Sequence, residues 1–225
     1  SLKSHVVVDG FTTIGDDNKI FPFATLGLEP QHMRYEGEES TLVIGDRNLI
    51  REYVCMHPGT NVGIMTTVVG DDNMFLIHAH VGHDAVLGNN IIMVNSSMVG
   101  GHAVIGNHVY LAASSAVKPF VRIGDQAMIW ALSAVVADVI PYGTVSGSPG
   151  DLIGLNLIGL KRRGFTKEQI QIIRRAYRLL FAMEGTFAER LEEVEHLYGN
   201  EDLVRVMLQF IKDGGDQPLS HPARV

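Results

Sequence analysis

A six-residue period runs through the middle of this sequence and constrains its fold more than any other feature. Every sixth residue from Val69 to Val135 is apolar, the residue two places before it is often small, and glycine often follows it. An α-helix repeats every 3.6 residues, so a strict six-residue spacing would drift around its surface. Hexapeptide repeats are typical of a parallel β-helix, in which three units of one short strand and one turn close a triangular coil of about 18 residues.

The period also predicts which side chains fill the interior. The apolar and small residues should point inward and stack on their counterparts in the next coil. Glycine with Asn or Asp should form the corners, as in segments 45–48 (GDRN) and 70–73 (GDDN), because these residues adopt a positive φ at little cost. The same phase predicts further inward residues upstream, at Val8, Ile14, Ile20, Leu26, Ile44, Ile50 and Met56.

The period breaks at two points and ends near residue 140. Residues 28–42 are polar and charged, which indicates a loop that leaves the prism, and residues 58–66 indicate a smaller one. We therefore expect a β-helix over 1–140, a linker and connecting segment over 141–165, a small helical domain over 166–213 and a loose tail over 214–225. Capping boxes at Thr166–Gln169 and Thr186–Glu189 predict two helix starts, and a third amphipathic run covers about 201–212. Because the chain begins in mid-repeat, we also expect a short or truncated N-terminal part.

Composition excludes several classes of protein. The formal net charge of −7 argues against nucleic acid as a partner, since a phosphate-binding surface is usually basic. The single cysteine, Cys55, cannot form an internal disulfide. No run approaches the roughly 20 apolar residues of an integral membrane segment, and no secretory signal opens the chain. We expect a soluble, cytoplasmic protein.

Histidines gather on one stretch of the predicted prism. The chain has ten, and five of them are His57, His78, His80, His83 and His102. The last two are one coil plus one residue apart, so they should be neighbours on successive coils. His83 lies two places past an inward position and should face outward.

Three interpretations of this cluster stay open. In the first, His83 is a general base oriented by Asp84, because imidazole titrates near neutral pH and suits proton abstraction from a hydroxyl. In the second, His78, His80 and His83 bind zinc, as three histidines do in hexapeptide carbonic anhydrases. In the third, the histidines fill outward positions of a non-catalytic trimeric scaffold.

Several segments resemble the UDP-N-acetylglucosamine O-acyltransferase family. They are HAHVGHD at 78–84 and GLKRRGF at 159–165, with further matches at 2–8 and 45–52, and the resemblance runs from Leu2 to about Phe210. It implies a left-handed coil and a homotrimer with sites between subunits. It implies transfer of a 3-hydroxyacyl group from acyl carrier protein to the 3-hydroxyl of UDP-N-acetylglucosamine, the first step of lipid A biosynthesis. It implies no cofactor and no metal.

The resemblance also implies roles for individual residues. His83 would remove the hydroxyl proton, Asp84 would support His83, and the Gly101 N–H would stabilise the oxyanion. The residues expected to contact substrate are Gln31, His32, Arg34, His57, His80, His102, Lys118, Asn156, Arg162 and Arg163. Gln31 and Arg34 would approach the nucleotide-sugar from an adjacent subunit, and Asn156, Arg162 and Arg163 would hold pantetheine or UDP phosphates. The cations between Lys161 and Arg178 would form a docking face for the acidic carrier protein.

Three positions depart from the family pattern. His32 stands where the family usually has Asp, Arg34 where it has Lys, and Lys118-Pro119 where it has His-Gln. Because these positions normally meet the sugar and nucleotide, a 3-amino sugar acceptor stays open. So does another hexapeptide acyltransferase activity with an acyl-CoA donor.

Overall fold

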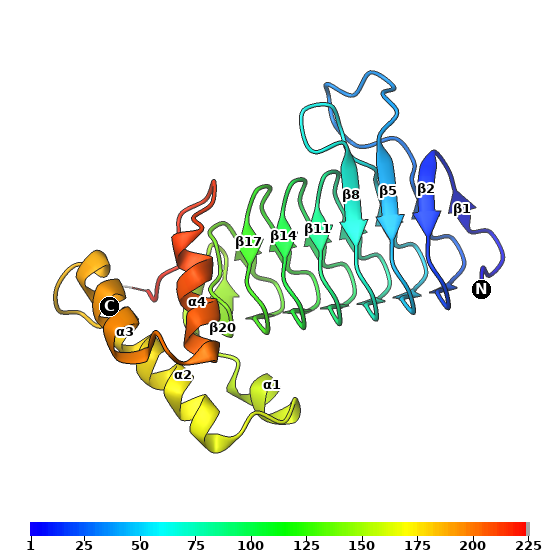
Figure 1. Cartoon of the computed structure of the whole chain (residues 1–225). Coiled ribbons are helices and arrows are strands. Elements are labelled where there is room, and N and C mark those ends of the chain that lie inside the picture. The colour runs from blue at the N-terminus through cyan, green and yellow to red at the C-terminus, as the bar shows by residue number, and fades with distance from the viewer. Residues whose placement is uncertain (224–225) are drawn as a thin grey trace.

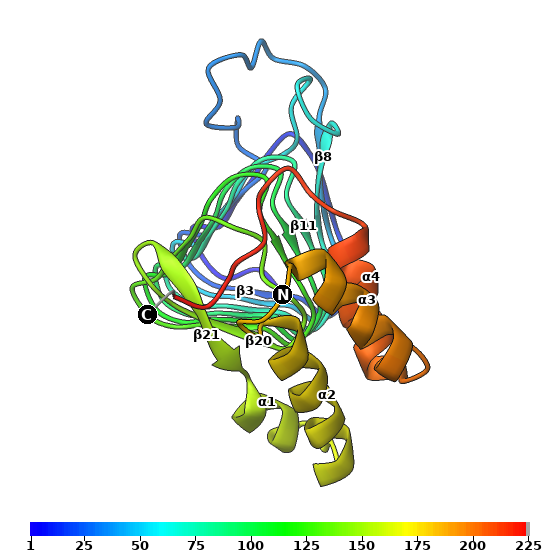
Figure 2. The same cartoon turned by 90° about the vertical axis from the view of Figure 1, so that its left-hand side faces the viewer.

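The computed structural model describes residues 1–223 as a triangular prism with a helical end. Figure 1 shows the coils side by side along the prism, and Figure 2 looks along its axis at the triangular outline. Each face is a parallel sheet whose neighbouring strands come from successive coils. The fold is therefore mainly β, a left-handed parallel β-helix followed by helices, as the sequence and the resemblance led us to expect.

The strands are short and form three sheets. The first sheet holds β1 (Val7–Val8), β4 (Thr25–Leu26), β7 (Cys55–Met56), β10 (His80–Val81), β13 (Met98–Val99), β16 (Ala116–Val117) and β19 (Ala134–Val135). The second holds β2 (Phe11–Ile14), β5 (Thr41–Ile44), β8 (Thr66–Val69), β11 (Val86–Leu87), β14 (Val104–Ile105) and β17 (Arg122–Ile123). The third holds β3 (Lys19–Ile20), β6 (Leu49–Ile50), β9 (Met74–Phe75), β12 (Ile92–Met93), β15 (Tyr110–Leu111), β18 (Met128–Ile129), β20 (Gly143–Gly147) and β21 (Gly150–Leu155).

The predicted inward residues form the core. Every sixth residue from Val69 to Val135 is buried, with at most 4% of its surface exposed. The small residues two places earlier, such as Ala79 and Ser97, are fully buried as well. The upstream prediction is wrong for Val8, which is 42% exposed because β1 is the edge strand of its sheet, and Ile14 is only half-buried.

The corners follow a different rule from the one we expected. The residues with positive φ are Asp17, Arg47 and Asp72 and their counterparts, and the glycines before them are not left-handed. Gly45 is needed for close approach instead, since a Cβ there would lie 2.9 Å from the Gly70 backbone. This approach lets side chains in one coil accept hydrogen bonds from the backbone of the coil before it, as the Asp46 N–H donates to Asp71 Oδ1 at 2.8 Å.

Both predicted excursions leave the prism at the corner between the first and second sheets. Residues 27–40 join β4 to β5, and residues 57–65 join β7 to β8. Figure 1 shows the two loops rising together above these strands, and the Asn61 N–H donates to Glu38 Oε1 at 2.8 Å between them. The two loops therefore build a wall beside the coils that follow, along the same edge.

The segment 141–165, expected as a linker, is regular structure. Its glycines and prolines mark an antiparallel hairpin of β20 and β21, which continues the third sheet, and α1 (Leu157–Arg162) follows. The helices α2 (Lys167–Leu180), α3 (Phe187–Tyr198) and α4 (Asp202–Lys212) complete the fold, and both predicted capping boxes are present. No helix among residues 1–223 has the length and apolar character needed to cross a bilayer.

The expected loose tail is wrong for residues 214–223. The Asp138 N–H donates to the Pro218 carbonyl, and the Ser220 N–H returns a bond to the Asp138 carbonyl, both at 2.7 Å. Backbone hydrogen bonds of this kind require no pattern of apolar side chains, so the polar sequence of this segment did not predict the pairing. Residues 224–225 of the predicted tail lie outside the described residues.

Candidate active site

The corner that carries the two loops also carries a column of rings on the coils that follow. His83, His102 and Phe120 lie between the first and second sheets on three successive coils. The His83 and His102 rings meet edge to face with centroids 4.9 Å apart, and the His102 ring stacks on Phe120 at 4.3 Å. The spacing argument from the sequence therefore placed His83 and His102 correctly as neighbours.

His83 is paired with the residue that follows it. Its Nδ1–H donates to Asp84 Oδ2 at 2.8 Å, and the two side chains are 14% and 0% exposed. A carboxylate on Nδ1 fixes the tautomer that leaves Nε2 unprotonated. The side chain of His83 therefore presents a proton acceptor at the surface of the corner.

Asp84 is anchored by the smaller loop. Its Oδ1 accepts from the Thr60 and Ile64 N–H groups at 3.1 and 2.9 Å, and its Oδ2 accepts from Thr60 Oγ1 at 2.6 Å. Burial would raise the pKa of this carboxyl, but hydrogen bonds from Thr60 and His83 outweigh burial and lower the pKa. Gly63 completes the cradle, since a Cβ there would lie 2.2 Å from the Asp84 carboxyl carbon. Asp84 is thus held ionised with little freedom to move.

Gly101 lies directly against the His83 ring. A Cβ at this position would lie 2.6 Å from both Nε2 and Cε1 of His83, so only glycine leaves room for the ring. Within residues 1–223 the Gly101 N–H has no hydrogen-bond acceptor. A donor without a partner beside an unprotonated ring nitrogen could stabilise negative charge on a reacting oxygen.

A cavity of about 370 Å³ opens over the ring column. It is lined by His32, Arg34, Val62, His83, His102, Pro119 and Phe120. The His32 ring lies 4.9 Å from the His83 ring, centroid to centroid, so the larger loop reaches the site of its own chain. Burial lowers the pKa of His102, and nearby His83 and His32 lower it further. His102 is therefore predominantly neutral at neutral pH.

His57 and His80 belong to a second cluster, together with Cys55. Cys55 Sγ lies 3.3 Å from His57 Nε2, and the ring centroids of the two histidines are 5.4 Å apart. Burial would raise the pKa of the Cys55 thiol, but hydrogen bonds with His57 and His80 outweigh burial and lower the pKa to about 5. Burial also opposes the charge on His57, but its contact with Cys55 raises its pKa.

The three histidines of the zinc interpretation are separated by the fold. His78 lies at another corner and stacks on Tyr53, with centroids 4.8 Å apart. His80 joins Cys55, and His83 joins Asp84 and His102. Within residues 1–223 of a single chain, His78, His80 and His83 do not converge on one point.

The other predicted substrate residues do not line this cavity in the single chain. Gln31 is exposed on the larger loop, and Lys118 Nζ bonds to Gln217 Oε1 at 2.8 Å. Asn156 caps α1 by accepting from the Gly159 N–H at 3.0 Å. Arg162 and Arg163 are exposed at the end of that helix.

Sequence reasoning missed three residues of the site. Thr60 anchors Asp84, Phe120 supports His102, and Cys55 contacts His57. Phe120 lies eighteen residues after His102, so the coil period could have found it. No sequence signal relates Thr60 to Asp84, because the loop fold brings them together.

Comparisons with known proteins point in one direction. The family described as UDP N-acetylglucosamine O-acyltransferase, domain 2, matches residues 138–217. A protein of Caulobacter vibrioides named acyl-[acyl-carrier-protein]–UDP-N-acetylglucosamine O-acyltransferase is 53% identical over 223 residues, covering 99% of this chain and 85% of its own. A protein of the same name from Methylobacterium radiotolerans is 56% identical over 207 residues, covering 92% and 76%.

Solved structures agree in fold. The UDP-N-acetylglucosamine acyltransferase of Francisella novicida is 32% identical and superposes with a TM-score of 0.95, covering 99% of this chain and 82% of that one. The UDP-N-acetylglucosamine O-acyltransferase of Moraxella catarrhalis is 37% identical with a TM-score of 0.94, covering 98% and 85%. The likeness thus spans both the prism and the helical end.

Proposed function

The chain belongs to the UDP-N-acetylglucosamine O-acyltransferase family, and on that premise we propose that His83 is the general base of its acyl transfer. The activity is that of an acyl-[acyl-carrier-protein]–UDP-N-acetylglucosamine O-acyltransferase, the first step of lipid A biosynthesis. We propose a 3-hydroxyacyl group as the group transferred and the sugar 3-hydroxyl as its acceptor. A cytoplasmic location belongs to the proposal, and the single cysteine permits a reducing compartment.

One observation carries the proposed mechanism. The His83 Nδ1–H bonds to an anchored carboxylate, while its Nε2 lies 2.6 Å from the position that a Cβ of Gly101 would occupy. Nε2 would take the proton of the sugar hydroxyl as its oxygen attacks the thioester carbonyl carbon. The C–S bond would then break, and His83 would return the proton to the leaving pantetheine thiolate. A general base of this kind typically contributes about 10² to 10⁴ in rate.

Two groups would stabilise the charges that develop. The Gly101 N–H would donate to the oxyanion, and one such donor contributes about 3–4 kcal/mol in known acyl-transfer sites. Asp84 would stabilise the imidazolium of His83, since it is fully buried and ionised. The neutral imidazole of His102 adds no positive charge that would oppose protonation of its neighbour.

We propose that the remaining predicted residues hold the substrates. His32, Arg34, His57, His80 and His102 would contact the sugar and nucleotide, because the loops and the corner bring them to one edge of the prism. The remaining residues of this set are Gln31, Lys118, Asn156, Arg162 and Arg163. For α1 we propose that Asn156 and its arginines serve the cavity of a neighbouring subunit.

A stripe of valines supports a homotrimer with sites between subunits. Val43, Val68, Val86 and Val104 lie in register across the second sheet and point out of the prism. Flat apolar stripes on a sheet face are costly in water and favour burial against another surface. Val86→Glu should therefore lower the molar mass measured by light scattering from that of three chains to that of one, while Lys19→Glu on the third sheet should not.

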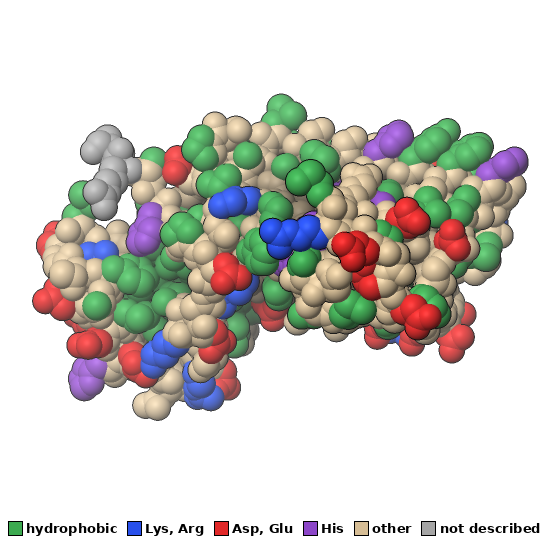
Figure 3. All heavy atoms as spheres, turned by 90° about the horizontal axis from the view of Figure 1, so that it is seen from above, with side chains coloured by type: hydrophobic (Ala, Val, Ile, Leu, Met, Phe, Trp, Pro, Cys, Tyr) green, Lys and Arg blue, Asp and Glu red, His purple; other side chains and the backbone are tan. Residues whose placement is uncertain are grey.

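A basic surface on the helices supports acyl carrier protein as the donor. Seven cations on α1, α2 and the segment between them form no ion pair with any carboxylate among residues 1–223. They are Lys161, Arg162, Arg163, Lys167, Arg174, Arg175 and Arg178. In the view from above, the Lys and Arg side chains visible at the helical end lie among Asp and Glu side chains (Figure 3). A small pocket of about 160 Å³ between Arg174, Arg178 and Tyr177 offers an apolar contact beside these charges. An acidic carrier would find both charge complementarity and an anchor point here.

The carrier proposal predicts a selective kinetic defect. Replacing Arg174 and Arg178 together by Glu should raise KM for the acyl carrier protein at least tenfold at low salt, and added salt should reduce the difference. KM for the nucleotide-sugar should stay unchanged. An equal KM for the acyl carrier protein in parent and variant would show that the carrier does not use this surface.

The central test is a mass-spectrometric transfer assay. Parent, His83→Ala and His78→Ala would each be mixed with 3-hydroxyacyl carrier proteins of several chain lengths and UDP-N-acetylglucosamine or its 3-amino analogue. We expect product from the parent, a loss of at least about 10² with His83→Ala, and little change with His78→Ala, which removes a ring that stacks on Tyr53 at another corner. Full activity of a folded His83→Ala would refute the proposed base. If only the 3-amino sugar gives product, a different acceptor would explain why His32 stands where the family usually has Asp.

A further inference from the structure

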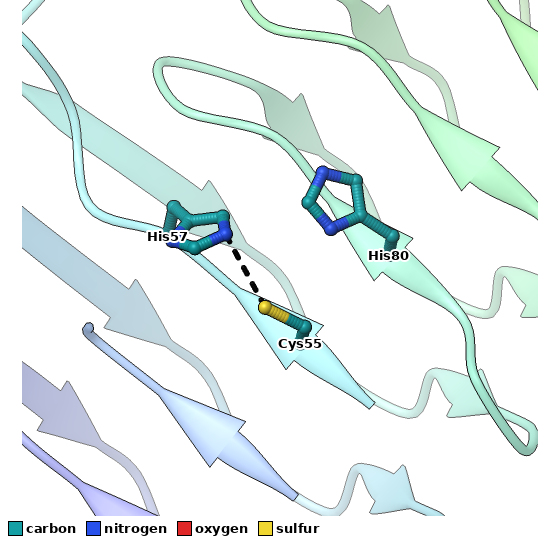
Figure 4. Close-up of side chains that lie close together, drawn as sticks. All are labelled: Cys55, His57 and His80. Atoms are coloured by element: carbon teal, nitrogen blue, oxygen red, sulfur yellow. Dashed lines mark hydrogen bonds between the residues drawn. The ribbon is translucent and has the colours of Figure 1, made fainter. Parts of the chain in front are cut away.

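The cluster of Cys55, His57 and His80 is distinct from the His83 pair and has the composition of a metal site. Cys55 lies on β7 and His80 on β10, and the two residues are direct partners in the register of the first sheet. Their side chains therefore leave the same face of the prism, and His57 turns back toward them just after β7 ends (Figure 4). One ligand atom from each residue lies within 4.8 Å of the other two.

His57 is oriented as a ligating histidine is. Its Nδ1–H donates to the Leu28 carbonyl at 3.0 Å, which leaves Nε2 aimed at Cys55 Sγ, and a bound ion would replace the proton shared by these two atoms. Histidine ligands commonly donate their other ring nitrogen to a carbonyl or carboxylate, because this fixes both tautomer and ring direction. His57 is 4% exposed, whereas Cys55 and His80 are half-buried, so one side of the cluster stays open to an incoming ion.

The distances suit a small tetrahedral ion. Zn–S bonds of about 2.3 Å and Zn–N bonds of about 2.0–2.1 Å place sulfur and nitrogen about 3.6 Å apart across a tetrahedron. The observed separation between Cys55 Sγ and His57 Nε2 is 3.3 Å. A thiolate with two imidazoles is a soft donor set that disfavours Mg²⁺ and Ca²⁺.

We propose that Cys55, His57 and His80 bind one thiophilic divalent cation, of which Zn²⁺ is the type, with a fourth position left for water. The ion is not required for the acyl transfer described above. Because His57 and His80 also belong to the proposed substrate residues, a bound ion would occupy them and slow the reaction. The cluster would then make the enzyme sensitive to free zinc.

A second group of possible ligands provides the internal control. His83, Asp84 and His102 also lie within ligand distance of one another, but they contain no sulfur. Co²⁺, which replaces Zn²⁺ in tetrahedral sites, gives a near-ultraviolet charge-transfer band only when a thiolate binds it. The spectrum therefore separates the two groups, and the measurement does not depend on acyl transfer.

The experiment titrates the metal-free, reduced protein with Co²⁺ and then displaces the Co²⁺ with Zn²⁺. We expect a thiolate charge-transfer band that saturates at one ion per chain in the parent and in His83→Ala. Cys55→Ser, which preserves size and a polar atom beside His57, should lose the band and bind Zn²⁺ at least tenfold more weakly. Circular dichroism would verify that each variant is folded.

A second measurement uses the unaltered chain. Cys55 is its single cysteine, so the rate of alkylation by iodoacetamide reports on this thiol alone. We expect Zn²⁺ to slow alkylation at least tenfold in both the parent and His83→Ala. The proposal is overturned if no thiolate band appears at micromolar Co²⁺, if Zn²⁺ leaves the alkylation rate unchanged, or if binding survives in Cys55→Ser and vanishes in His83→Ala.

Discussion

Replacing Asp84 by Asn is the sharpest test of how the carboxylate acts on His83. Oδ1 accepts from two backbone N–H groups, those of Thr60 and Ile64, and neither can turn away. The amide of Asn must therefore keep its oxygen on this side and place its NH₂ where Oδ2 was. The NH₂ then faces His83 Nδ1, which has to accept a proton instead of donating one. The proton moves to Nε2, and the nitrogen that should act as the base is blocked.

The magnitudes follow from this geometry. Loss of the unprotonated Nε2 should lower kcat/KM by about 10² to 10⁴, the whole contribution of a general base. The two backbone N–H groups stay paired, the Thr60 hydroxyl has to turn and accept from the new NH₂, and all three bonds lose their charge assistance, so the fold should be destabilised by about 1–3 kcal/mol. Substrate binding should change little, which places the defect in kcat. The measurements are initial rates by mass spectrometry and denaturant unfolding of the same preparations.

Asp72→Asn is the matched control. Asp72 has nearly the same left-handed backbone, with φ of 58° in both residues, but it pairs with Arg47 at an exposed corner. An exposed pair contributes little to stability because solvent screens it, so this variant should keep full activity. If Asp84→Asn keeps kcat/KM within tenfold of the parent while remaining folded, the carboxylate does not set the tautomer of His83.

Further predictions concern the site and the core. Gly101→Ala should lower kcat by about 10², because the new Cβ displaces a ring now 2.6 Å from that position, and the rate assay would detect it. Folding lowers the pKa of Asp84 below its ordinary value of 3.8, so its contribution to stability is complete above that pH and lost as pH falls through the lowered pKa. Unfolding measured against pH should therefore show parent stability falling toward that of Asp84→Asn in this acid range. Thr166→Ala should lower the unfolding free energy by about 1 kcal/mol through loss of the cap at α2. Phe75→Ala should lower it by about 3–5 kcal/mol, since the side chain is fully buried; calorimetry would measure both.

The architecture could be predicted because each coil has to meet the same packing requirement. A six-residue unit must bury one apolar side chain, so the phase that starts at Val69 identifies the core as far as Val135. What the repeat does not contain could not be predicted in this way. Val8 carries the right phase but lies on an edge strand, and the pairing of residues 218–220 with Asp138 depends on backbone groups that every sequence has.

The residues of the site that repeat from coil to coil could be predicted from the sequence. The residues that the loops supply could not. Counting one coil plus one residue from His83 leads to His102, and counting one coil from His102 leads to Phe120. The residues supplied by the loops do not follow this count. His32 and Thr60 reach their partners only because the excursions lengthen the interval between hydrogen-bonded coils from 18 residues to 25 and 30.

The two excursions explain why chemistry is concentrated at a single corner of a repetitive prism. A regular corner buries its backbone amides in bonds to the next coil and leaves little room for a substrate. At this corner, the smaller loop supplies Thr60 and Ile64 to hold Asp84, and the larger loop supplies His32 as the opposite wall. The next coil then contributes Gly101, which lacks the Cβ that would collide with the His83 ring and whose N–H has no acceptor among residues 1–223. A reactive site in this fold therefore needs an interruption of the repeat on one coil and an intact repeat on the next.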